Sequence, residues 1–198
     1  MRRAGGWLVI LLGALLVIFG AAIAVLFGPD DEVVSGPHPL SSKGIAIATA
    51  PSAIGYAGPT VQVRVISADE RRVFVGLAHD VDVKDYLADS AYTRVDMISL
   101  PWDTTTSQVA GDDSAARLPA KLDWWLVSET AVGEASMTFT LPDDSVDVVV
   151  TNADLRPGVR IEATVTALRS GAFVGGLGMA VFGFGLMVVG RVLTVSPG

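Results

Sequence analysis

The chain has 198 residues, of which 51% are hydrophobic and 18% are charged, and its formal net charge is −7. Soluble domains average roughly 25% charged residues, so this composition excludes a disordered polyelectrolyte and disfavours a fully soluble globule. The excess of acids argues against nucleic acid as a partner, because phosphate groups bind basic surfaces. There is no cysteine, which excludes disulfides, thiolate zinc sites and cysteine nucleophiles.

Two long runs, residues 7–27 and 171–190, contain no charged side chain. At a helical rise of about 1.5 Å per residue, each run spans about 30 Å, the thickness of the hydrocarbon core of a bilayer. We expect both to be transmembrane helices. A cleaved signal peptide is the alternative for the first run, because Ala22-Ile23-Ala24 resembles a cleavage site of small residues.

The basic residues that flank these runs predict the orientation. Arg2 and Arg3 precede the first run and Arg191 follows the second, whereas acids follow the first run at 30–32. The positive-inside rule therefore predicts a plasma-membrane protein with both termini in the cytoplasm. The predicted organisation is a cytoplasmic N-terminus 1–6, a transmembrane helix 7–27, a linker 28–42, an extracytoplasmic domain 43–169, a transmembrane helix 170–190 and a cytoplasmic C-terminus 191–198.

Glycines recur at helical spacing in both apolar runs. In the first run they lie seven residues apart and form one face, at Gly6, Gly13 and Gly20. The second run has one glycine face at Gly176, Gly183 and Gly190 and another at Gly171, Gly175, Gly178 and Gly185. Small residues let helices approach closely in a bilayer, so we expect one face to receive the first helix and the other to be free for another subunit or membrane protein. The alternative is that glycine is simply common in membrane helices.

The segment between the apolar runs is rich in short β-type patterns bounded by turn residues. Strands are predicted at 44–50, 60–67, 73–78, 93–100, 124–127, 136–141, 146–151 and 159–168. One short helix is predicted at 85–91, and residues 101–123 are predicted to form a long polar loop. No strand–helix–strand alternation is present, so we expect an antiparallel β-sandwich or barrel of about seven or eight strands.

Two segments of the domain carry recognisable motifs. Residues 73–95 contain VGLA, DV and YL, and residues 133–159 contain VVV, NAD and GV. They resemble a family of uncharacterised actinobacterial membrane proteins with motifs of the type FVGIA…ADV..YL and VVVMNADG..GV. This chain departs from the pattern at Thr151, where the family has methionine, and at Leu155, where it has glycine. It also lacks the tryptophan that the family has shortly before the valine run. The resemblance implies an envelope-facing domain and implies no activity.

The pattern His79-Asp80-x-Asp82 offers one imidazole and two carboxylates, which are ligands for zinc or manganese. In an extended strand, however, Asp80 and Asp82 share one face while His79 points to the other. A solvated strand end or turn is therefore the favoured interpretation, and a metal site at these three residues is the weaker one. No catalytic residue and no cofactor is assigned, because no established catalytic motif occurs.

Tryptophan provides the candidate partner contacts. Trp124 and Trp125 are adjacent in a predicted strand, so one ring should face the core and the other should face outward. The outward ring could contact a partner or the bilayer, and Trp102 in the long loop is a further candidate. One buried ring and one incidental surface ring is the alternative.

These observations favour a non-enzymatic membrane protein of the bacterial cell envelope. Its acidic β-sandwich would serve protein–protein interaction, as an accessory or assembly factor of a membrane or cell-wall complex. The expected partners are the lipid bilayer and other membrane or envelope proteins, or a second copy of the chain. The alternatives are a domain that binds or senses an envelope lipid, glycan or cation, and a metal-dependent hydrolase.

Overall fold

The computed structural model describes residues 2–53, 60–99, 103–112 and 117–195, and the chain divides into two compact units. One unit combines the segments up to Val33 and from Leu168 onward, and the other is Val34–Ala167. The elements in chain order are α1 (Arg2–Phe27), β1 (Glu32–Ser42), β2 (Ala46–Thr49), β3 (Thr60–Ser67), β4 (Arg72–His79), α2 (Asp80–Leu87), β5 (Tyr92–Ser99), β6 (Asp103–Val109), the 3₁₀ turn η1 (Pro119–Lys121), β7 (Val127–Val132), β8 (Glu134–Thr140), β9 (Val146–Asn152), β10 (Val159–Leu168) and α3 (Ala172–Val195).

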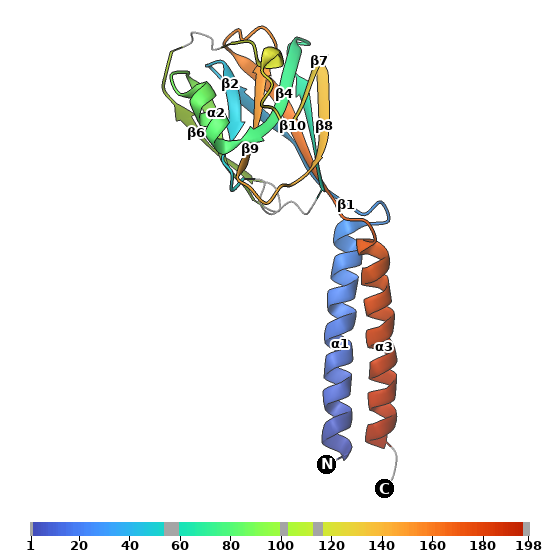
Figure 1. Ribbon diagram of the computed structural model, residues 1–198. Coiled ribbons are helices and arrows are strands. Elements are labelled where there is room, and N and C mark those ends of the chain that lie inside the picture. Colours follow the sequence, from blue (N-terminus) through green and yellow to red (C-terminus); the bar gives the residue numbers. More distant parts are fainter. Residues whose placement is uncertain (1, 54–59, 100–102, 113–116, 196–198) are drawn as a thin grey trace. The chain divides into compact units, whose positions relative to one another are not determined.

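The first unit is an antiparallel pair formed by α1 and α3 (Figure 1). Its apolar segments, Gly5–Phe27 and Ala172–Val195, have 23 and 24 residues and are long and apolar enough to cross a membrane. At about 1.5 Å per residue each is about 35 Å long. α3 continues one turn beyond the predicted end at 190, and it carries Arg191 exposed on its surface. A long arginine side chain at a helix end can extend its charge to the membrane interface.

The second unit is a β-sandwich. One sheet has four strands in the order β1-β10-β3-β8, and the other has six in the order β6-β5-β2-β9-β4-β7. The predicted sandwich is therefore confirmed, with ten strands in the described part of the chain. The expectation of a purely antiparallel sheet is wrong at one place, because β2 pairs with β5 in parallel. The two strands are joined through β3, β4 and α2, and this long crossover leaves no local sequence pattern.

The core between the two sheets is built mostly from valine. In β3 the alternation of the sequence places Val61, Val63 and Val65 inward. β9 is buried at all seven positions, because the core covers one of its faces while α2 and the Trp124–Trp125 segment cover the other. Each fully buried valine contributes roughly 1.5–3 kcal/mol, so the packed sheets dominate the stability of this unit.

Two segments expected to lack strands contribute edge strands instead. The predicted linker 28–42 contains β1, and the predicted loop 101–123 contains β6 and η1. β1 tolerates Pro37 and Pro39 because it is the edge of its sheet, where a missing N–H costs little. β6 is also an edge strand, and its threonine-rich sequence shows no apolar alternation.

The short helix lies earlier than predicted. α2 spans Asp80–Leu87 rather than 85–91, and it begins directly after β4 ends. Val83 and Leu87, four residues apart, are both buried against the six-stranded sheet. The alternation Val-Asp-Val-Lys at 81–84 is typical of a strand. Residues four apart share one face of a helix, however, so the helical conformation buries Val83 and Leu87 together against the sheet.

Candidate functional site

The predicted metal pattern lies at the junction of β4 and α2. His79 is the last residue of β4, and Asp80 and Asp82 both lie in the first turn of α2. Asp80 Oδ2 accepts a hydrogen bond from Lys84 Nζ at 2.7 Å, which is an i,i+4 ion pair on the helix. Across residues 2–53, 60–99, 103–112 and 117–195, no three His, Asp or Glu side chains are grouped to hold a metal ion.

Two aspartates lie close together where α2 packs on the sheet, and one of them, Asp147, is buried while the other, Asp80, is partly buried. Asp147 of β9 is 3% exposed, and burial, together with the neighbouring Asp80 carboxyl, raises the pKa of Asp147 to about 7. The Oδ1 atoms of Asp80 and Asp147 are both buried without a hydrogen-bond partner among the described residues. Lys84 and Arg94 favour the charged form of Asp147, but the opposing effects are larger. A proton shared by the two carboxyls would provide both Oδ1 atoms with a partner.

The proximity of Asp80 and Asp147 was not predicted from the sequence, although a signal was present. Asp147 is the only charged residue in β9, between valines at 146 and 148, and a lone acid in a continuous apolar strand must be either paired or neutral. Which partner it meets could not be derived, because Asp80 comes from a different element.

The two adjacent tryptophans lie outside any strand. Trp124 and Trp125 precede β7, so the predicted strand at 124–127 is wrong, and so is the expectation that the two rings face opposite sides. Their ring centroids are 4.1 Å apart, and Tyr86 of α2 lies 5.6 Å from Trp124. Trp125 also donates from Nε1 to the carbonyl of Pro119 at 2.9 Å. The two tryptophan rings are thus half-buried, and together they cover part of the outer face of the six-stranded sheet. Trp102 lies outside the described residues.

Glycines form the contact between α1 and α3. The pairs are Gly6 with Gly190, Gly13 with Gly183 and Gly20 with Gly176. A Cβ added to any of these six glycines would lie 2.5–2.9 Å from the carbonyl oxygen of its partner glycine. The two backbones therefore approach so closely that no other residue fits without moving a helix, which is the packing that small residues permit in a bilayer.

The second glycine face of α3 is not in contact with α1. A Cβ added at Gly175, Gly178 or Gly185 would meet no atom within 4 Å among the described residues. Gly171 precedes α3 and has a positive φ of 79°, which makes it part of the turn that leads into the helix. There the Asp31 carboxylate accepts hydrogen bonds from the backbone N–H groups of Phe173 and Gly171, each at 2.7 Å, and these bonds lower the pKa of Asp31.

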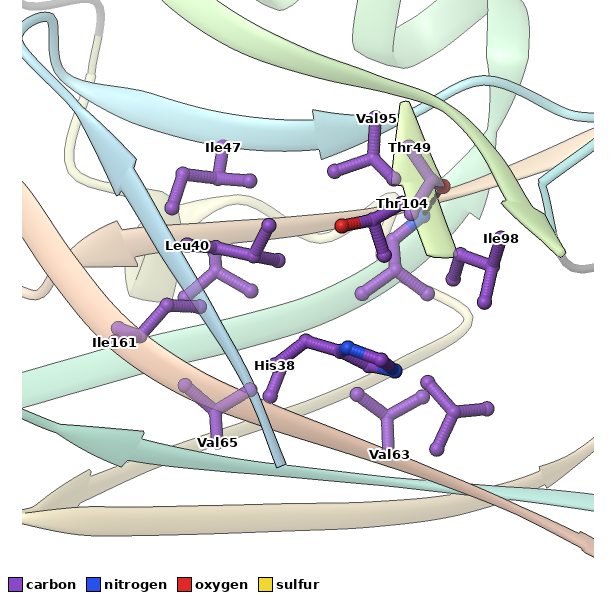
Figure 2. Close-up of a pocket in the computed structure, with 14 residues that line it drawn as sticks. His38, Leu40, Ile47, Thr49, Val63, Val65, Val95, Ile98, Thr104 and Ile161 are labelled. Carbon is purple, nitrogen blue, oxygen red and sulfur yellow. Dashed lines mark hydrogen bonds between the residues drawn. The ribbon is translucent and has the colours of Figure 1, made fainter. Parts of the chain in front are cut away.

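An apolar cavity opens between the two sheets (Figure 2). His38 and Leu40 of β1 face Ile98 of β5 and Thr104 of β6 across it. Its volume is about 50 Å³, whereas small-molecule sites usually have about 300–1,000 Å³. His38 is held by a hydrogen bond of 3.0 Å to Ser35 Oγ. The cavity has room for a few water molecules and is too small for a lipid chain.

A larger depression lies where the β3–β4 and β9–β10 turns meet. It has a volume of about 430 Å³. It is lined by Arg71, Arg72, Leu118, Ala153, Asp154 and Arg156, which we call the arginine groove. Three guanidinium groups and one carboxylate are therefore gathered at one place on an acidic domain. None of these arginines stood out in the sequence, since they come from two turns far apart in the chain.

No protein-family model and no curated protein matches this sequence. Among solved structures, a xylanase fragment of Clostridium thermocellum (a CBM22 and a GH10 module with xylohexaose) is 8% identical, with a TM-score of 0.26 over 71% of this chain and 27% of that one. The VP2 subviral particle of infectious bursal disease virus is 13% identical, with a TM-score of 0.21 over 75% of this chain and 35% of that one. A CBM4 structure is 13% identical, with a TM-score of 0.17 over 69% of this chain and 55% of that one. This chain thus spans roughly a quarter to a half of the solved chains, and such low similarity carries no functional argument.

Proposed function

We propose that this chain is a non-enzymatic membrane protein of the bacterial cell envelope that presents its acidic sandwich to other proteins. In this proposal it is an accessory or assembly factor of a larger membrane or cell-wall complex. The envelope setting is supported by the actinobacterial family resemblance of 73–95 and 133–159. Membrane insertion is supported by the two apolar helices.

The proposed orientation places both termini in the cytoplasm and the sandwich outside. It is supported by Arg2 and Arg3 before α1, Arg191 near the end of α3, and the acids at 30–32. Segment 28–170 carries 21 acids and 11 bases, a net charge of about −10. A segment of this length crosses the membrane largely regardless of its own charge.

The observation that carries the proposed interaction is the second glycine face of α3. α1 occupies the face at 176, 183 and 190, and the face at 175, 178 and 185 is open in the described chain. Helices gain little from the hydrophobic effect within a bilayer, because lipid tails are as apolar as their side chains, so association depends on faces that allow close backbone approach. A further helix, from another membrane protein or from a second copy, fits this open face.

The test is recovery of partners from membranes with the tagged full chain in mild detergent. Leucine at Gly178 should reduce the recovery of a stoichiometric partner several-fold, because the added side chain fills the open face. Phe184 is the matched control, since it is 64% exposed on a different face of α3. Equal recovery with Gly178→Leu and Phe184→Leu, or no stoichiometric partner with the unmodified chain, would reject the proposed interaction.

A second candidate function is the binding of an envelope ligand. The cavity in Figure 2 does not favour an apolar ligand, because about 50 Å³ is too small. The arginine groove, at about 430 Å³, favours an anionic ligand.

A further inference from the structure

We propose that the arginine groove binds a small ligand that carries a phosphate or a carboxylate group. The inference rests on the second candidate function, ligand binding. It does not depend on the partner of α3. Three properties of the groove support this binding: its charge, the rigidity of the turns that form it, and its size.

The groove concentrates positive charge on a negative domain. Most other basic side chains of the sandwich are neutralised by an adjacent acid, in the pairs Arg64–Glu134, Lys84–Asp80, Arg94–Asp96 and Arg160–Asp69. Arg71 and Arg72, in contrast, are exposed and form no ion pair within the described part of the chain. Two adjacent guanidiniums that are not paired with a carboxylate are electrostatically complementary to an anion.

The third arginine adds to this charge and can be redirected to a ligand. Arg156 Nε lies 3.1 Å from Asp154 Oδ2, and the two side chains are 75% and 57% exposed. An exposed ion pair of this kind contributes little net stability, so the guanidinium can turn to an incoming anion at small cost. The groove as a whole then has a formal charge of +2.

Backbone contacts hold the two turns in fixed positions. The Arg72 carbonyl accepts a hydrogen bond from Ala153 N–H at 2.9 Å, which joins the β3–β4 turn to the β9–β10 turn. Asn152 Nδ2 donates to the Arg156 carbonyl at 2.7 Å, and Arg156 N–H donates to Asp154 Oδ1 at 3.2 Å. The arginines therefore project from a preformed scaffold, and less entropy is lost when a ligand binds.

The chemistry of the groove indicates the class of ligand. The guanidinium fork matches the paired oxygens of a carboxylate or phosphate, which it can bind in a bidentate manner. Leu118 and Ala153 add an apolar surface, and Asp154 adds an acceptor for a hydroxyl group. A volume of about 430 Å³ lies within the usual range for small-molecule sites. The ligand is therefore an anionic unit about the size of one sugar.

The test is calorimetric titration of the full chain in mild detergent at low ionic strength. The probes are glucose 6-phosphate, glucuronate and glucose. The two anions should bind while glucose should not, and the tighter of the two identifies the oxyanion as phosphate or carboxylate. Arg71→Gln/Arg72→Gln should weaken anion binding at least tenfold. The control Arg64→Gln, whose arginine lies on β3 in an ion pair, should bind as the unmodified chain does.

Three results would overturn the proposal: no binding of either anion, equal binding of glucose, or unchanged binding by the Arg71→Gln/Arg72→Gln variant. A melting curve of each variant verifies that the sandwich is folded. Failure here leaves the proposed helix partner untouched, because that test depends on Gly178 of α3 and not on the groove.

Discussion

Replacement of Asp147 by asparagine should stabilise the sandwich at neutral pH and leave it unchanged in acid. The pKa of the Asp147 carboxyl is about 7 in the folded protein, against 3.8 for an unperturbed aspartate. In the pH range between these values the folded state holds a proton that the unfolded state has released. Folding stability therefore falls as pH rises from about 4 to about 7, and it is constant with respect to this group above that range.

The magnitude follows from the size of the shift. A difference of roughly three pKa units, at 1.36 kcal/mol per unit, corresponds to about 4 kcal/mol of stability lost by pH 7. Asparagine has nearly the same shape and never ionises, so the variant avoids this loss. The difference in unfolding free energy between Asp147→Asn and the unmodified chain should therefore grow by up to about 4 kcal/mol between pH 4 and pH 8.

The assay is urea unfolding of the full chain in mild detergent at several pH values, followed by tryptophan fluorescence. Trp124 and Trp125 report on the relevant face, because they pack with α2 over the six-stranded sheet. Asp85→Asn is the matched control for the loss of one carboxylate, since Asp85 is exposed on the same helix. A pH-independent difference for Asp147→Asn, or destabilisation at every pH, would contradict a raised pKa for the buried Asp147 carboxyl.

Three further changes test the packing. Gly76→Ala should destabilise the sandwich by about 1–3 kcal/mol in urea unfolding, because the added Cβ would lie 2.6 Å from Trp125 Cε3, and an unchanged midpoint would contradict this contact. Asp31→Asn should speed amide hydrogen exchange at Phe173. In the unmodified chain the Asp31 carboxylate should stop protecting this amide only as pH falls below 3.8, because hydrogen bonding lowers the pKa of Asp31. Equal exchange rates in the variant and the unmodified chain would argue against the hydrogen bond from Phe173 N–H to Asp31. Gly13→Leu should lower the melting temperature of the helical circular dichroism signal in micelles, since a Cβ there lies 2.5 Å from a backbone oxygen of α3; an unaltered melt would exclude the close helix contact.

Patterns along the chain were sufficient for the elements that are defined by their own periodicity. β3 and β10 have the bounds that the alternation at 60–67 and 159–168 predicts. Both apolar helices follow from the length of their uncharged runs. The seven-residue glycine spacing indicated which face of each helix could approach a neighbour, because this periodicity is a property of a single helix.

Other features depend on which segments meet in space. β1 and β6 are strands only because a neighbouring strand supplies their hydrogen bonds at a sheet edge, and an edge strand needs no apolar alternation. The parallel pairing of β2 with β5 and the position of α2 likewise arise from packing on the completed sheet. A local pattern carries no information about such pairings.

The two candidate sites show the same division most clearly. The sequence by itself determined two membrane-length helices and a valine-rich β domain, because burial requires apolar residues at regular spacing. Only the tertiary structure brought Asp147 against Asp80 beneath α2, and only the pairing of β4 with β9 brought Arg72 and Arg156 to one groove. Electrostatic interactions act through space between groups that are distant in the chain, so these sites could not be predicted before the strands were placed side by side.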